Sequence, residues 1–156
     1  MSDGPGLREA SRPIPAIFLG GLLAGALDLT YAIVVYSPQR PLLIPQAIAA
    51  GIYGRHSFQL GWQSILVGTL CHFAIALGAA VTYYLASRKL PVMIHRPVLC
   101  GLIFGALVYV FMHTVVLPLS AAPPSHARLF VRACEFVWHW FGVGLPISLS
   151  ARRYSG

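Results

Sequence analysis

Five ionisable side chains lie inside or at the edge of long apolar stretches of this 156-residue chain: Asp28, His72, His113, Glu135 and His139. An imidazole gains and loses a proton near neutral pH, and a neighbouring carboxylate can stabilise its charged form. Imidazole nitrogens and carboxylate oxygens are also ligands for zinc, iron or copper. Because an ionisable group is costly to place in hydrocarbon, these five residues form the candidate functional site.

The five residues fall at compatible depths if the apolar stretches are helices of alternating direction. With a rise of about 1.5 Å per residue, His72 lies near the bilayer centre and the other four lie toward the outer face. We expect the Asp and His residues to line one pocket that opens outward, with Glu135 at its mouth. Arg132 can serve Glu135 but lies too near the interface to reach Asp28 easily, so a protonated histidine is the expected partner of Asp28.

The spacing of small residues predicts which helix faces meet. Residues four apart lie on one helix face, and small residues there let helices approach closely. Glu135 and His139 are one turn apart and can share a face. Buried polar residues can also simply join helices by hydrogen bonds, without further function. The predicted stripes are Gly20, Ala24 and Asp28; Gly68, His72, Ala76 and Ala80; and Gly101, Gly105, Tyr109 and His113.

The elements that must position these residues are membrane helices. The chain is 57% hydrophobic and only 10% charged, with a mean hydropathy of +0.72, whereas soluble domains carry about a quarter charged residues. This composition disfavours a soluble enzyme, a disordered chain and a nucleic-acid-binding module. Four apolar stretches are near the length that spans a bilayer. We therefore predict an all-α polytopic membrane protein, a single domain over 1–156, with four transmembrane helices in one bundle at about 14–36, 60–86, 97–117 and 129–150.

A short helix is predicted in the first outer loop, from about Ile44 to Tyr53. Pro45 suits its first turn and Gly54 its end. It is too short to cross the membrane, and apolar residues almost encircle it. We therefore expect it to lie at the interface and pack over the bundle.

The distribution of Lys and Arg predicts the orientation. Basic residues are enriched on the cytoplasmic side of membrane proteins. The termini and the second loop carry Arg8, Arg12, Arg88, Lys89, Arg96, Arg152 and Arg153, and the opposite side carries Arg40, Arg55, Arg128 and Arg132. Both termini are thus predicted to be cytoplasmic. A cleaved signal peptide ending near Ala26 is the alternative, but the apolar run continues to Tyr36.

The second half of the chain, from about Val67 to Arg153, resembles the YagU-like family of bacterial inner-membrane proteins. The elements that carry the resemblance are His72, His113 followed by Pro118-Leu119, and Glu135-x-x-x-His139 before a basic C-terminus. The first loop is shorter here than in that pattern. The resemblance implies a small multi-pass protein of the bacterial inner membrane with the same polar residues, and it implies no reaction.

Three functions remain open from the sequence. The first is a proton-responsive or proton-coupled membrane protein that uses the Asp, Glu and His residues named above. The second is a non-catalytic accessory or assembly subunit, as a homo-oligomer or in a larger membrane complex. The third, weaker one is metal or haem binding; no cofactor is predicted. The chain has no nucleotide-binding loop and no Gly-x-Ser-x-Gly motif, which disfavours an enzyme, while an intramembrane acid/base site acting on lipid stays open as an alternative. The expected partner is the lipid bilayer, and no nucleic acid is expected.

Overall fold

The computed structural model describes residues 12–124 and 127–155, and within these ranges the chain is all-helical, as predicted. Arg8, one of the basic residues used for orientation, lies outside the described residues. The elements in chain order are α1 (Pro13–Tyr36), α2 (Leu43–Tyr53), η1 (Gly54–Gln59), α3 (Trp62–Lys89), α4 (Val92–His95), α5 (Pro97–Phe111), η2 (Met112–Val116), α6 (Leu117–Leu119), α7 (Leu129–Trp138), η3 (His139–Gly144) and α8 (Leu145–Arg153).

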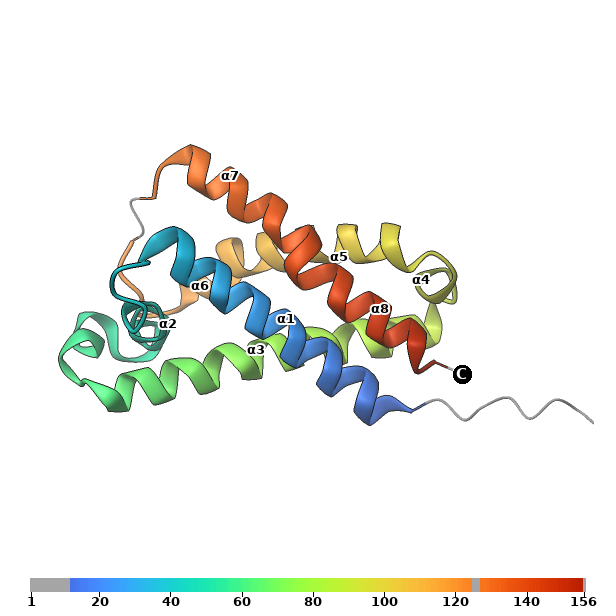
Figure 1. Cartoon of the computed structure of the whole chain (residues 1–156), viewed down its shortest axis with the longest axis horizontal. Coiled ribbons are helices and arrows are strands. Elements are labelled where there is room, and N and C mark those ends of the chain that lie inside the picture. The colour runs from blue at the N-terminus through green and yellow to red at the C-terminus, as the bar shows by residue number, and fades with distance from the viewer. Residues whose placement is uncertain (1–11, 125–126, 156) are drawn as a thin grey trace, which may run out of the picture.

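Three helices are long and apolar enough to cross a membrane: α1, α3 and the continuous run Pro97–Leu119, which comprises α5, η2 and α6. Their composition marks this chain as a membrane protein. The last helical run, Leu129–Arg153, is as long but more polar, because it contains Arg132 and Glu135 and ends in two arginines. In Figure 1 this last run lies beside α1, and both pass across α3 and α5.

Close contacts at glycine explain how these helices pack. A Cβ atom at Gly105 would collide with the carbonyl oxygen of His139, and one at Gly101 would meet the side chain of Ser148. On α1, Gly21 packs against Leu77 of α3. The small-residue faces therefore contact neighbouring helices, as their spacing predicts.

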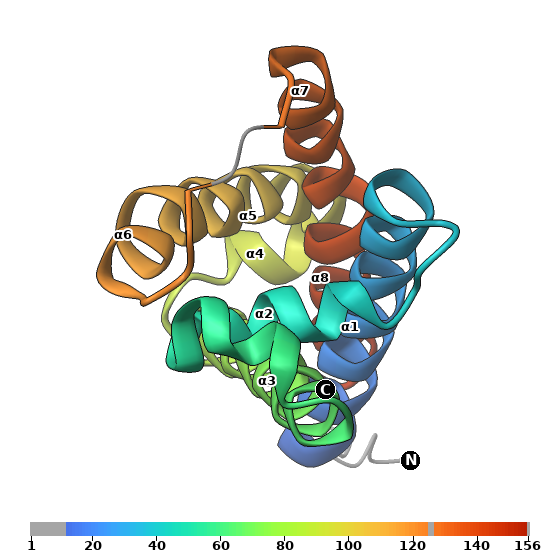
Figure 2. The same cartoon turned by 90° about the vertical axis from the view of Figure 1, so that its left-hand side faces the viewer.

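Helix α2 packs across the start of α3 (Figure 2). The backbone of Pro45 lies so close to Gly68 that a Cβ there would overlap its carbonyl oxygen. The side chain of Gln46 donates to Ser64 Oγ at 3.4 Å, and Ser57 Oγ donates to the Gln46 carbonyl oxygen at 2.6 Å. The helix ends at Gly54, whose φ of +56° favours glycine.

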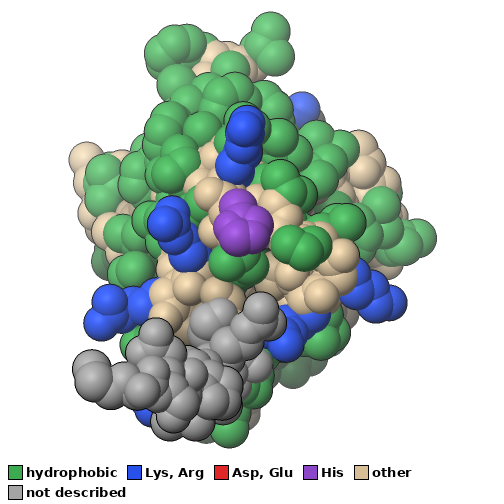
Figure 3. Space-filling model, turned by 90° about the vertical axis from the view of Figure 1, so that its right-hand side faces the viewer, with side chains coloured by type: hydrophobic (Ala, Val, Ile, Leu, Met, Phe, Trp, Pro, Cys, Tyr) green, Lys and Arg blue, Asp and Glu red, His purple; other side chains and the backbone are tan. Residues whose placement is uncertain are grey.

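The interior is built from small side chains and the exterior from large apolar ones. Ala24, Ala80 and Ser148 are buried, whereas Leu119, Leu129 and Phe130 are more than three-quarters exposed. Large apolar side chains on the outside suit a protein surrounded by lipid. Figure 3 shows the end of the molecule where exposed basic side chains gather. The exposed basic residues of this end are Arg12, Arg88, Lys89, Arg96, Arg152 and Arg153.

Two connections are more helical than the sequence predicts. The third stretch continues past 117 to Leu119 and includes Pro118, which lies in the last turn of the continuous run. The second stretch runs on to Lys89, and the basic loop after it contains the short helix α4.

Candidate functional site

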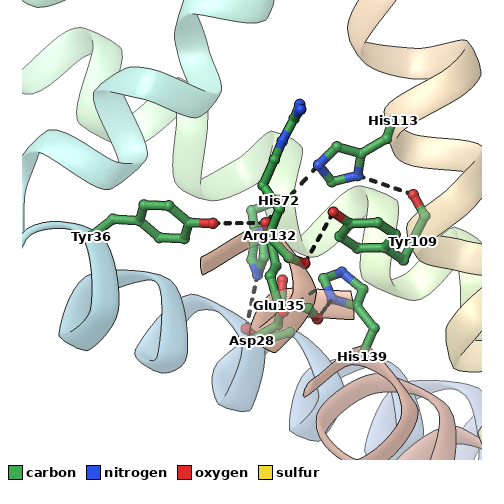
Figure 4. Close-up of polar contacts among 9 residues, drawn as sticks. Asp28, Tyr36, His72, Tyr109, His113, Arg132, Glu135 and His139 are labelled. Carbon is green, nitrogen blue, oxygen red and sulfur yellow. Dashed lines mark hydrogen bonds and ion pairs between the residues drawn. The ribbon is translucent and has the colours of Figure 1, made fainter. Parts of the chain in front are cut away.

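A cavity of about 290 Å³ lies among α1, α3, α5–η2 and α7–η3, and all five residues singled out from the sequence line it. Its remaining walls are mostly apolar, including Ile44 and Ile48 of α2. Figure 4 shows the polar side chains that converge on it. The polar groups thus converge from several helices on a largely apolar hollow.

Two π-helical turns position the histidines nearest the carboxylates. His113 lies in η2 and His139 begins η3. A π-helical turn is wider than an α-helical one and commonly occurs at functional sites. At η3 the close approach of Gly105 to the His139 carbonyl fixes how the helix passes α5.

The backbone determines which imidazole nitrogen carries the proton. His139 Nδ1 lies 2.9 Å from the carbonyl oxygen of Glu135, and His113 Nδ1 lies 3.1 Å from that of Tyr109. A carbonyl oxygen only accepts hydrogen bonds, so each Nδ1 must be the donor. In the neutral ring, Nε2 is then left with a lone pair and no proton.

Each of these Nε2 atoms faces a carboxylate. His139 Nε2 is 3.8 Å from Asp28 Oδ1, and His113 Nε2 is 4.0 Å from Glu135 Oε2. His139 is buried, and the other three side chains are about one-fifth exposed. With neutral rings and ionised carboxylates, both contacts place an acceptor opposite an acceptor. One proton on either Nε2 would convert its contact into a donor–acceptor pair of opposite charges.

His72 also lines the cavity but has a different partner. Its Nε2 donates to the carbonyl oxygen of Gly25 at 2.8 Å and so joins α3 to α1. The two ion-pair contacts of the cavity involve the other two histidines. His72 therefore fits the simpler interpretation of a polar residue that joins two helices.

Tyr36 is a site residue that the sequence analysis did not identify as one. Its hydroxyl group donates to Glu135 Oε2 at 2.7 Å and so connects the end of α1 to α7. Its spacing of eight residues from Asp28 could have revealed it, since residues at i, i+4 and i+8 follow one helix face. Ala32, the residue between them in this series, also lines the cavity.

Aromatic rings pack against the residues of the site. Trp138 stacks on Tyr31 with ring centroids 4.7 Å apart, which ties α7 to α1. Tyr109 stacks on His113 at 4.0 Å, and its edge contact with His139 is at 5.2 Å. These contacts restrict the rotation of both imidazole rings.

Within residues 12–124 and 127–155, no group of three or more His, Cys, Asp or Glu side chains is arranged to hold a metal ion. Comparison of the chain with models of protein families, with curated proteins and with solved structures found no match. The chemistry of the cavity therefore carries the functional argument.

Proposed function

We propose that this chain is a proton-responsive membrane protein in which the pairs Asp28–His139 and Glu135–His113 take up protons. The observation that carries the proposal is the direction of the two Nε2 lone pairs, each of which faces a carboxylate. Histidine changes its charge in the physiological pH range, which makes these pairs the part of the cavity able to respond to pH.

The proposal includes the placement of the chain in a bilayer. Leu129–Arg153 is the fourth crossing, and its polar residues Arg132 and Glu135 turn toward the cavity end of the bundle. The basic end seen in Figure 3 faces the cytoplasm by the positive-inside rule. The cavity then opens to the outer compartment, and α2 lies along the outer surface.

The membrane in question is the bacterial inner membrane, with both termini cytoplasmic. This localisation and membership of the YagU-like family rest on the sequence resemblance, which covers His72, His113, Glu135 and His139.

Nitrogen-15 NMR of histidine in lipid nanodiscs tests the proposal. At high pH, His113 and His139 should both give the spectrum of the tautomer protonated at Nδ1. As the pH falls, both should convert to imidazolium. The opposite tautomer at high pH, or neutral rings throughout the range from about pH 5 to about pH 8, would refute proton uptake by these pairs.

Two conservative variants form a matched control. In Asp28→Asn, the imidazolium signal of His139 should weaken at a given pH while that of His113 changes little, because only His139 loses its counter-ion. Glu135→Gln should have the reverse effect. Equal changes of both histidines in both variants would contradict two separate pairs.

A further inference from the structure

The polar atoms that the cavity presents are mainly hydrogen-bond acceptors. The N–H of each neutral imidazole already donates to a backbone carbonyl: Gly25 for His72, Tyr109 for His113 and Glu135 for His139. The Tyr36 hydroxyl donates to Glu135. What remains is a set of imidazole lone pairs and two carboxylates. Arg132 has further donors, but its side chain extends away from Asp28 and His139 in Figure 4. A ligand for this surface must therefore bring its own protons.

An apolar groove of about 480 Å³ adjoins the cavity. It lies between α3 and the α5–η2 run, and its lining is apolar except for Thr82, whose hydroxyl group donates to the Gly78 carbonyl oxygen. Four residues line both hollows: Ile75, Ala79, Val108 and Met112. A molecule lying in the groove can thus reach the polar surface without leaving the protein.

From these two features we infer that the protein binds an amphipathic amine, with its ammonium group at Asp28 and Glu135 and its apolar chain in the groove between α3 and α5. An ammonium group supplies N–H donors and a positive charge, which match acceptors and carboxylates. The inference rests on the proposed function, because amines and protons use the same lone pairs.

Competition with protons follows from the groups that surround the site. When the histidines become charged they repel an ammonium ion and cease to be acceptors, so amine binding weakens as the pH falls. The titratable and charged side chains that face the two carboxylates are Tyr31 and Tyr36 of α1, His72 of α3, Tyr109 and His113 of α5–η2, and Arg132, Cys134 and His139 of α7–η3.

Equilibrium dialysis of radiolabelled octylamine against the full chain in phosphatidylcholine nanodiscs tests this inference. Octylamine stays protonated across the range used, and binding to empty nanodiscs is subtracted. Saturable binding is expected at about pH 8, with an affinity about tenfold lower at about pH 5.5. Asp28→Asn and Glu135→Gln should each lower the affinity at about pH 8 by about tenfold, since each removes a charge-assisted contact.

Gly78→Leu tests the groove separately. Gly78 lines the groove, and a Cβ there would meet no neighbouring helix within 4 Å, so we expect a leucine to extend into the groove. This variant should weaken the binding of octylamine but not of ethylamine, and it should leave the histidine titration unchanged. Unchanged octylamine binding in this variant would overturn the groove assignment, and equal binding of octanol would overturn the assignment of an amine.

The outcomes separate the two proposals. Normal histidine titration without saturable octylamine binding would refute amine binding and leave the proton-responsive function in place. Octylamine binding that does not change with pH would refute the competition. Histidines that do not titrate would refute the proposed function itself, whatever the amine does.

Discussion

Glu135 and His139 lie one helical turn apart and both line the cavity, but their side chains bind different partners. The one-turn spacing of Glu135 and His139 suggested that the two side chains share a face. In the structure the His139 ring binds the backbone carbonyl of Glu135, while the carboxylate turns to Tyr36 and His113. The partner that the Glu135 carboxylate takes depends on contacts with α1 and η2, which are distant from it in sequence. Local spacing therefore predicts five of the residues that line the cavity but not Tyr36, and tertiary packing decides their partners.

The close packing at Gly105 predicts that adding a single methyl group there destabilises the protein. In Gly105→Ala the new Cβ would collide with the His139 carbonyl oxygen, a backbone atom that cannot rotate away. We expect the free energy of unfolding to fall by ~1–3 kcal/mol, as for other overpacked positions. Unfolding in mixed micelles followed by circular dichroism measures this change.

Gly78→Ala is the matched control, because its Cβ meets open space. It should raise stability by ~0.5–1 kcal/mol through the higher helix propensity of alanine. If Gly105→Ala were as stable as Gly78→Ala, the close approach of α5 to η3 would be wrong.

At the scale of elements, apolar length and turn residues predicted the helices well. The first predicted stretch, 14–36, agrees with Pro13–Tyr36 to within one residue, and Pro45 and Gly54 mark the observed ends of α2. The two π-helical turns were not predicted. A π turn shifts the register of a helix by one residue, and at η3 the shift accompanies the contact with Gly105. Such a contact cannot be predicted from the hydropathy of the segment that contains the π turn.

The packing of α2 can be tested by cysteine labelling. Ala50 is fully buried and Ala47 is exposed on the same helix. In a variant whose native Cys71, Cys100 and Cys134 are changed to alanine, Ala47→Cys should react with a water-soluble maleimide about tenfold faster or more than Ala50→Cys. The buried thiol reacts only after local opening. Equally fast labelling at both positions would contradict packing of α2 on α3.

At the scale of the whole molecule, composition predicted a membrane protein, and the structure has the corresponding arrangement of small residues inside and large apolar residues outside. The groove between α3 and α5 could not be predicted from sequence. Leu107 and Phe111 line this groove and remain more than half exposed instead of closing it. Hydropathy does not distinguish a side chain that faces a neighbouring helix from one that faces lipid.

The proposed orientation predicts the signals of reporter fusions. A reporter fused after Gly156 should be active in the cytoplasm, because the basic end of the bundle faces that side. A reporter inserted near Pro123, at the opposite end, should be active outside. A cytoplasmic signal from the Pro123 insertion would show that the proposed orientation is wrong. The cavity would then take its protons from the cytoplasm.

The pairing of Asp28 with His139 has a consequence for biogenesis. Asp28 belongs to α1, which leaves the ribosome before the helical run Leu129–Arg153 that contains His139. At ~5–20 residues per second, synthesis of the intervening chain takes roughly 5–20 s. During that delay the Asp28 carboxyl group has to enter the membrane before the His139 imidazole is present. Placing an unpaired carboxyl group in hydrocarbon costs free energy. If Leu129–Arg153 is the fourth crossing, as proposed, the nascent protein completes its polar cavity only when that run inserts, and truncation before it leaves Asp28 without its partner.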